Sequence, residues 1–405
     1  MKRFTADNFA GCLVGGAIGD ALGYVIEFME SDAIFQKYGD DGLRDFSQEE
    51  DVFISDDTQM TMFTANGLLY YATSGGPAGR SLNECIHDAY MDWLHSQNSG
   101  KASLPDKNTV SWILNIKEMR AQRAPGNTCL SALRSGKRGT VDDPVNNSKG
   151  CGGIMRVAPI GLFVKDPLRA ARIAADAAAL THGHPLGYIS SAAYAYIINR
   201  IVYTDDDLTD IISGCVKTIS REYGSYIETA RLIDLLTKAV ALAIPDDEPY
   251  IRERRHFERT TKMAEDAALF TQPVVLAPPV KKYSDIDMKA EAARLEKLGA
   301  GWVAEETLAI AVYCCLRFGD DLETAVRVAA NHSGDSDSTA SLTGAIIGAG
   351  IGNSNMPTKY VMLLEMYDVL LELAQDLYDG CQASDTVVRA DDEVWREKYV
   401  DHTYI

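Results

Sequence analysis

The sequence lacks the features that mark redox, nucleic-acid-binding and membrane proteins. Its 405 residues include eight cysteines but no CxxC pair, which favours reduced, mostly buried thiols in a cytoplasmic protein. No apolar run reaches about 18 residues, so no transmembrane helix is expected. Basic residues number 39 against 58 acidic ones, and the net charge is −19. This shortage of positive charge argues against nucleic-acid backbones and membranes as partners, although it leaves room for a small anionic ligand.

Alternating patterns typical of β-strands are also scarce, whereas apolar residues at helical spacing are common. We therefore expect an all-α fold, organised as one domain over residues 1–405 with a peripheral helical insertion at about 204–297. The proline-marked stretch at 271–285 is expected to be a loop. The clearest helical patterns cover residues 226–244, 306–318 and 360–378.

The N-terminal stretch "FAGCLVGGAIG" follows Lys2 and Arg3 and faintly resembles a signal peptide. However, Gly11, Gly15 and Gly19 recur every four residues, which places them on one face of a helix. We interpret the stretch as a core helix whose glycine face lets another helix approach closely.

Two short acidic clusters each precede an apolar, helix-like run. "HSGDSDSTAS" contains Asp335 and Asp337, and "ISDDTQM" contains Asp56 and Asp57. One interpretation is that these residues are helix N-caps, since Asp and Ser suit that position. The other is a metal site, because each cluster has more carboxylates than a cap uses, and hydroxyl groups beside them. Such hard oxygen ligands suit Mg²⁺ or Mn²⁺, and two ions become plausible if the clusters meet in space.

Three further stretches attract attention. "GDALGYVIEF" places Glu27 just after the first helix. "NNSKGCGGIMRVAPIGL" places glycines before an apolar segment, which is compatible with a phosphate-binding turn or with a tight structural turn. It is neither a Walker motif nor a dinucleotide fingerprint. "THGHP" contains His182 and His184, and a histidine is more often structural than a ligand contact.

Taken together, these motifs resemble the ADP-ribosylglycohydrolase family. Four landmarks of the family occur in order between residues 11 and 350: "GGAIGDALGYVIEF", "SDDTQM", "GCGGIMRVAPIGL" and "GDSDSTAS". The resemblance implies an all-α bundle with a central cleft that holds two Mg²⁺ or Mn²⁺ ions. It also implies hydrolysis of the glycosidic bond between ADP-ribose and a protein side chain, with arginine as the first candidate.

The resemblance further implies a set of site residues. Glu27, Asp56 and Asp335 would be catalytic. The metal ligands would be Ser55, Asp56, Asp57, Asp335, Asp337 and Ser338. The ligand-binding residues would be Ser148, Gly150, Cys151, Gly152, Gly153, His182 and Trp302.

The sequence departs from the family pattern at a few of these positions. Ser55 and Ser338 stand where many members have threonine, and both keep a hydroxyl oxygen. Cys151 stands where some members have asparagine, which puts one substrate hydrogen bond in doubt. Three alternatives stay open: hydrolysis of another ADP-ribose linkage or ribosyl compound, binding of ADP-ribose without cleavage, and a purely structural role.

Overall fold

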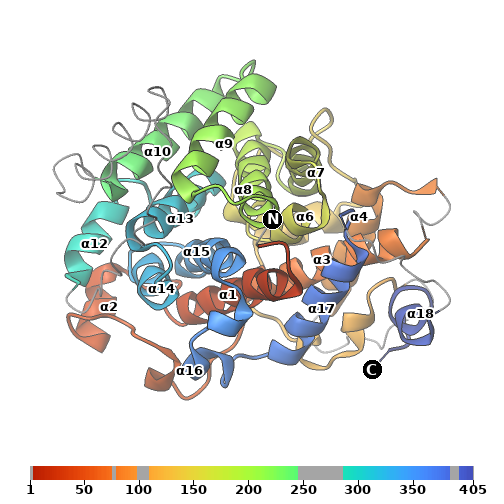
Figure 1. The fold of residues 1–405 in the computed structure, drawn as a ribbon, viewed down its shortest axis with the longest axis horizontal. Coiled ribbons are helices and arrows are strands. Elements are labelled where there is room, and N and C mark those ends of the chain that lie inside the picture. Colours follow the sequence, from red (N-terminus) through yellow and green to blue (C-terminus); the bar gives the residue numbers. More distant parts are fainter. Residues whose placement is uncertain (1–2, 75–78, 98–108, 245–285, 384–391, 405) are drawn as a thin grey trace, which may run out of the picture.

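The computed structural model describes residues 3–74, 79–97, 109–244, 286–383 and 392–404 (Figure 1). Within these ranges the secondary structure is helical, apart from one isolated antiparallel bridge between Gly150 and Val303. The all-α prediction is therefore confirmed. None of the helices in these ranges is long and apolar enough to cross a membrane.

The helices differ widely in length. The longer ones are α1 (Ala6–Tyr24), α3 (Asp56–Ser74), α4 (Leu82–Ser96), α7 (Pro167–Ala179), α8 (Pro185–Tyr203), α9 (Leu208–Tyr223), α10 (Glu228–Ala243), α13 (Ala304–Phe318), α15 (Ser336–Ile351) and α17 (Tyr367–Gly380). The shorter ones are α2 (Ser31–Tyr38), α5 (Asn127–Arg134), α6 (Ala158–Phe163), α12 (Met288–Leu295), α14 (Leu322–Ala330), α16 (Thr358–Val361) and α18 (Glu393–Tyr399). A 3₁₀ turn covers Cys151–Gly153.

Helices α1 and α15 lie side by side in the middle of the fold (Figure 1). Their glycines make this close approach possible: a Cβ atom on Gly15 would lie 2.3 Å from the Gly344 carbonyl oxygen, and one on Gly11 would lie 2.3 Å from that of Gly348. Because the residue numbers on the two helices run in opposite directions along the contact, the pair is antiparallel. The end of α1 therefore lies beside the start of α15, which is where the acidic motifs occur.

The described parts of segment 204–297 form α9, α10 and α12, of which α9 packs on α8 and α10 packs on α13 (Figure 1). The loop predicted at 271–285 lies outside the described residues. The helix expected at 226–244 is α10, and the one expected at 306–318 is α13, which begins at Ala304.

The prediction of one continuous helix over 360–378 is wrong. The chain leaves α16 after Val361 and passes through Met366, whose φ is +64°, before α17 begins at Tyr367. A left-handed residue cannot continue a helix. In this break the Glu365 carboxylate accepts a hydrogen bond from the Ile54 N–H at 3.1 Å, which ties the segment to the start of α3. Helical periodicity in the sequence did not reveal this tertiary contact.

Candidate functional site

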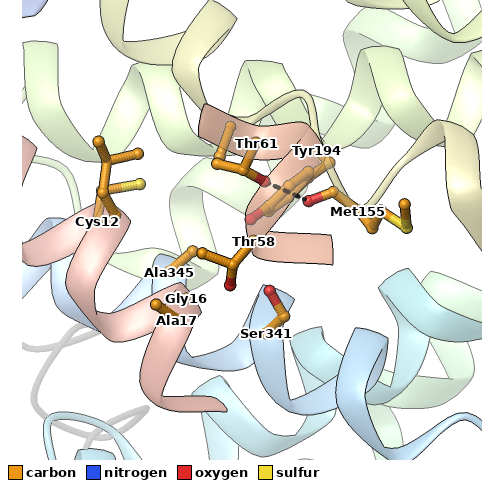
Figure 2. A pocket seen from close by; sticks show the side chains of 11 residues that line it. Cys12, Gly16, Ala17, Thr58, Thr61, Met155, Tyr194, Ser341 and Ala345 are labelled. Carbon is orange, nitrogen blue, oxygen red and sulfur yellow. Dashed lines mark hydrogen bonds between the residues drawn. The ribbon is translucent and has the colours of Figure 1, made fainter. Parts of the chain in front are cut away.

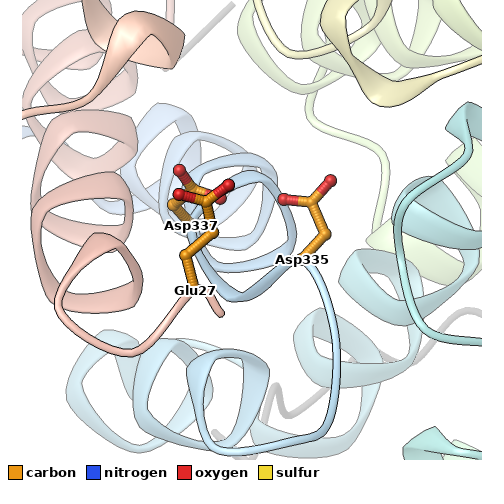
Figure 3. Close-up of side chains that lie close together, drawn as sticks. All are labelled: Glu27, Asp335 and Asp337. Atoms are coloured by element: carbon orange, nitrogen blue, oxygen red, sulfur yellow. The ribbon is translucent and has the colours of Figure 1, made fainter. Parts of the chain in front are cut away.

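The antiparallel contact of α1 with α15 brings three carboxylates together. Glu27 follows the end of α1, Asp335 is the N-cap of α15, and Asp337 lies in its first turn. Figure 3 shows the three side chains gathered at this junction, and one oxygen from each lies within 4.8 Å of the others. All three residues are buried, with at most 8% of their surface exposed. Residues 308 positions apart thus form one acidic cluster.

The second acidic motif is held nearby by Asp20, a buried residue of α1. Its carboxylate accepts hydrogen bonds from the N–H groups of Ser55, at 3.0 and 3.1 Å, and Thr58, at 3.1 Å, and from the Thr58 hydroxyl. The N-terminus of α3 is thereby fixed to α1. Sequence reasoning gave Asp20 no role. The pattern that could have indicated this role is a single aspartate between apolar positions near the end of a predicted core helix.

Of the two aspartates that begin α3, Asp56 has a carboxylate engaged by a backbone N–H group, whereas the bond found for Asp57 comes from its own backbone N–H. Asp56 accepts a hydrogen bond from the Gly126 N–H at 3.0 Å, and the Asp57 N–H donates to the Ser55 hydroxyl at 3.1 Å. Neither aspartate belongs to the group of carboxylates within 4.8 Å of one another. The two groups nevertheless interact, because the pKa of Asp56 and of Asp57 is raised first by burial and further by the charge of Asp337.

Burial raises the pKa of every carboxyl group in this region, and like charges add to the effect. The pKa of Glu27 rises to about 9 because of its burial and then because of Asp337, Asp56 and Asp20. The pKa of Asp335 and Asp57 is raised well above the usual range for the same two reasons. No salt bridge to these carboxylates is found in the ranges that the structure describes. The protein thus concentrates negative charge without supplying a cationic side chain.

The residues present fit a divalent cation. Three buried oxygens, Glu27 Oε2, Asp57 Oδ2 and Asp335 Oδ2, have no hydrogen-bond partner among the described residues. A buried carboxylate oxygen without a partner is costly, and a bound cation removes that cost. All of these donor atoms are oxygens, which suits Mg²⁺ or Mn²⁺ better than a thiophilic metal.

The glycine-rich turn lies next to this cluster and is tied to it by residues 299–304. The Asp335 N–H donates to the Ala300 carbonyl at 2.8 Å, and the Cys151 N–H donates to the Trp302 carbonyl at 3.2 Å. The Gly150 N–H donates to the Ser148 hydroxyl at 3.3 Å. The N–H groups of Gly150 and Cys151 are therefore already engaged within the protein, so less of this turn is available to an anion than its glycines suggest.

The remaining predicted ligand residues surround the turn. His182 is buried beneath it, and a Cβ atom on Gly150 or Gly152 would come within 3.4 Å of its Nε2 atom. A Cβ atom on Gly153 would lie 3.4 Å from the His182 Cβ atom. The Cys151 side chain is close enough to Asp335 for that charge, after burial, to raise the pKa of the thiol. His182 and Cys151 therefore belong to the same region as the acidic cluster.

Two exposed aromatic rings lie at the edge of the site. Phe28 follows Glu27 and is 74% exposed, and Trp302 is 42% exposed. Their ring centroids lie 6.0 Å apart with an interplanar angle of 18°, so the rings are stacked. Trp302 was predicted from the sequence, whereas Phe28 was not. The pair joins the edge of the acidic cluster to the edge of the glycine-rich turn.

Two other features close to the site are structural. His332 is buried, with Nδ1 bonded to the Ser333 carbonyl at 3.1 Å and Nε2 bonded to the Thr339 hydroxyl at 3.0 Å. Figure 2 shows a small cavity beside Thr58, Tyr194 and Ser341, which has room for roughly one water molecule. It is too small to admit a nucleotide.

Comparisons with known proteins agree with the sequence motifs. The family model for ADP-ribosylglycohydrolase matches residues 1–386. A mouse protein named ADP-ribosylhydrolase ARH3 is 24% identical over 406 residues, covering 93% of this chain and 92% of that protein. The human protein of the same name is 23% identical, covering 93% and 94%. A solved structure titled "ADP-ribosylglycohydrolase-related protein complex" has a TM-score of 0.55 at 19% identity, covers 93% of this chain and 99% of its own, and supports the fold.

Proposed function

Because the chain belongs to the ADP-ribosylglycohydrolase family, we propose that it hydrolyses the glycosidic bond between ADP-ribose and a protein side chain, with Mg²⁺ or Mn²⁺ bound. The single observation that carries the metal-dependent part is the buried group of Glu27, Asp335 and Asp337, whose oxygens lie within 4.8 Å of one another with no salt bridge to a described residue. Such a costly arrangement supports a bound cation over a purely structural role.

We propose two ions, held by Ser55, Asp56, Asp57, Asp335, Asp337 and Ser338, with Glu27 at the edge of this set. The unpartnered oxygens of Asp57 and Asp335 support this assignment. A bound divalent ion supplies positive charge and acts as a Lewis acid toward hydroxyl and water oxygens.

In the reaction, the bond between C1′ of the ribose and the side-chain atom breaks, and the leaving group keeps the electron pair and takes up a proton. A water oxygen bonds to C1′ as that water gives up a proton. Positive charge develops on the ribose, and we assign the carboxylates of Asp56 and Asp335 to its electrostatic stabilisation. We assign Glu27 to proton transfer or to the metal shell, because its Oε2 atom is free of hydrogen bonds among the described residues. The turn at residues 148–153, with His182, would hold the diphosphate.

The stacked pair of Phe28 and Trp302 supports arginine as the linked side chain. A guanidinium group is planar and positively charged, and such groups bind well to aromatic faces. A serine side chain offers neither property.

Three broader features complete the proposal. We propose that residues 1–405 form one domain with a peripheral insertion at about 204–297, which agrees with the packing of α9 and α10 on α8 and α13. A cytoplasmic location agrees with eight free cysteines, seven of which are buried. The partner is an ADP-ribose-modified protein or an ADP-ribose derivative, with no nucleic acid or membrane involved.

The test is release of free ADP-ribose from an arginine-linked substrate with Mg²⁺, with Mn²⁺ and with EDTA. Release that EDTA abolishes would support the proposal. A serine-linked substrate, tested in parallel, would identify a different linkage if it alone is cleaved. Tight binding of ADP-ribose without release from either substrate would favour the non-catalytic alternative.

A further inference from the structure

Arg156 is fully buried behind the glycine-rich turn, yet its contacts are with neutral groups. Its Nη2 atom donates to the Thr181 hydroxyl at 2.7 Å and to the Ala177 carbonyl at 3.2 Å. Its Nη1 atom lies 3.5 Å from Cys129 Sγ, and its guanidinium lies 4.2 Å from the centre of the Tyr90 ring. No salt bridge to Arg156 is found in the part of the chain that the structure describes. Burial of an unpaired charge is costly, so this position calls for a use beyond packing.

The hydrogen bond from Arg156 favours one direction for the hydrogen bond between Thr181 and His182. A guanidinium group only donates, so the Thr181 hydroxyl accepts from it. That hydroxyl then has its own hydrogen to donate, and its neighbour is His182 Nδ1 at 2.8 Å. The Thr181 hydroxyl is also within hydrogen-bond reach of the Cys129 thiol, which is a weaker acceptor than an imidazole nitrogen. In this order of bonds, Nδ1 of His182 is an acceptor and carries no hydrogen.

The imidazole ring of His182 is neutral, because burial and then the charge of Arg156 lower its pKa to about 3. A neutral ring carries one hydrogen, which therefore lies on Nε2. This atom lies next to Gly150 and Gly152, where an added Cβ atom would come within 3.4 Å of it. The described residues offer Nε2 no hydrogen-bond partner of their own. The N–H donor of a buried histidine thus faces the glycine-rich turn.

We propose that Arg156 and Thr181 are positioning residues that hold His182 as an Nε2–H donor to the diphosphate of ADP-ribose. This inference rests on the proposed function for its ligand. It also explains how the turn binds an anion although the N–H groups of Gly150 and Cys151 are engaged elsewhere. The buried charge of Arg156 adds an attractive field for the same anion.

The first test determines the tautomer of His182 by nitrogen-15 NMR of the imidazole groups. The chain has seven histidines, so the His182 signals can be assigned by their loss in a His182→Gln variant. The proposal expects a protonated Nε2 and an unprotonated Nδ1 in the free protein. A protonated Nδ1 would overturn it, and this result does not depend on whether the protein is an enzyme.

The second test uses Thr181→Val, which keeps the shape of the side chain and removes the hydroxyl, and Thr181→Ser, which restores it. ADP-ribose should bind the valine variant about tenfold more weakly, since a hydrogen bond to a charged group is lost or misdirected. KM for the substrate should rise similarly with little change in kcat, because the diphosphate is held alike before and during the reaction. The serine variant should recover both values.

Equal affinity of the valine variant and the wild type for ADP-ribose would overturn the positioning role. If the valine variant does not fold, as judged by circular dichroism, the tautomer measurement on the wild type decides alone. If the wild type binds ADP-ribose but cleaves no substrate, the proposed function fails while the positioning role still stands or falls on the two tests above.

Discussion

Replacing Gly19 with alanine should force α1 away from α15 and disturb the acidic cluster. A Cβ atom at this position would lie 2.0 Å from the Ala340 carbonyl oxygen, about 1.4 Å short of the 3.4 Å at which ordinary contact begins. The neighbour is helix backbone and cannot rotate away. Overpacking of this kind costs about 1–3 kcal/mol in the free energy of unfolding. The better helix propensity of alanine returns roughly 1 kcal/mol of that.

Gly16 provides a matched control on the same helix. A Cβ atom there would meet the Ala345 Cβ atom at 3.4 Å, which is ordinary contact. Gly16→Ala should therefore keep or raise the free energy of unfolding, by up to about 1 kcal/mol. Urea denaturation of both variants measures the difference.

Binding of Mn²⁺, followed by electron paramagnetic resonance, measures the effect on the site. Metal sites tolerate displacements of only about 0.5 Å, so separation of the helices in Gly19→Ala should weaken Mn²⁺ binding. A loss of about tenfold or more is expected, as for changes in the residues that support metal ligands. If both variants unfold at the same urea concentration and bind Mn²⁺ equally, the close approach of α1 and α15 does not set the geometry of the cluster.

Three further predictions concern individual side chains. Asp335→Ala and Asp57→Ala should each abolish metal-dependent release of ADP-ribose while leaving the circular dichroism unchanged, and normal activity in either would contradict the two-ion site. Phe28→Ala should lower kcat/KM for an arginine-linked substrate about threefold or more relative to a serine-linked one, since cation–π contacts contribute about 0.5–2 kcal/mol; equal losses would argue against stacking. Burial raises the pKa of Asp92 to about 6, so its contribution to the free energy of unfolding is greatest below about pH 4 and is lost as the pH rises to about 6. Asp92→Asn should remove that part of the pH dependence in urea titrations, and an unchanged curve would refute it.

The motifs that supply the candidate site residues are short and local, so residue order alone was enough to find them. The glycine spacing of the first helix predicted a close helix contact, and the structure places Gly344 and Gly348 against that face. The order of the motifs predicted the family and the all-α fold. Whether the two acidic motifs meet could not be decided, because that depends on the antiparallel contact of α1 with α15 and on the hydrogen bonds from the start of α3 to Asp20, which residue spacing does not encode.

The roles that sequence reasoning missed belong to residues that act across the fold. Asp20 binds the start of α3, 35 and 38 positions away, and Arg156 reaches Thr181, 25 positions away. Both were quoted within motifs without a role, because a single charged residue in an apolar run has no visible partner in the sequence. The break at Met366 was missed for a related reason, since it accompanies a contact between Glu365 and Ile54.

Helix capping and metal binding, the two interpretations of the acidic motifs, can now be weighed against each other. The structure contains capping interactions. The Asp335 carboxylate accepts a hydrogen bond from the Ser338 N–H at 3.4 Å, and the Asp20 carboxylate accepts one from the Ser55 N–H at the start of α3. A carboxylate near a helix N-terminus gains typically about 0.3–1 kcal/mol. Removing a charged group from water costs several times more, and here the pKa values of neighbouring carboxyl groups rise together. Capping therefore accounts for some of the oxygens, whereas the unpartnered atoms of Glu27, Asp57 and Asp335 call for a cation.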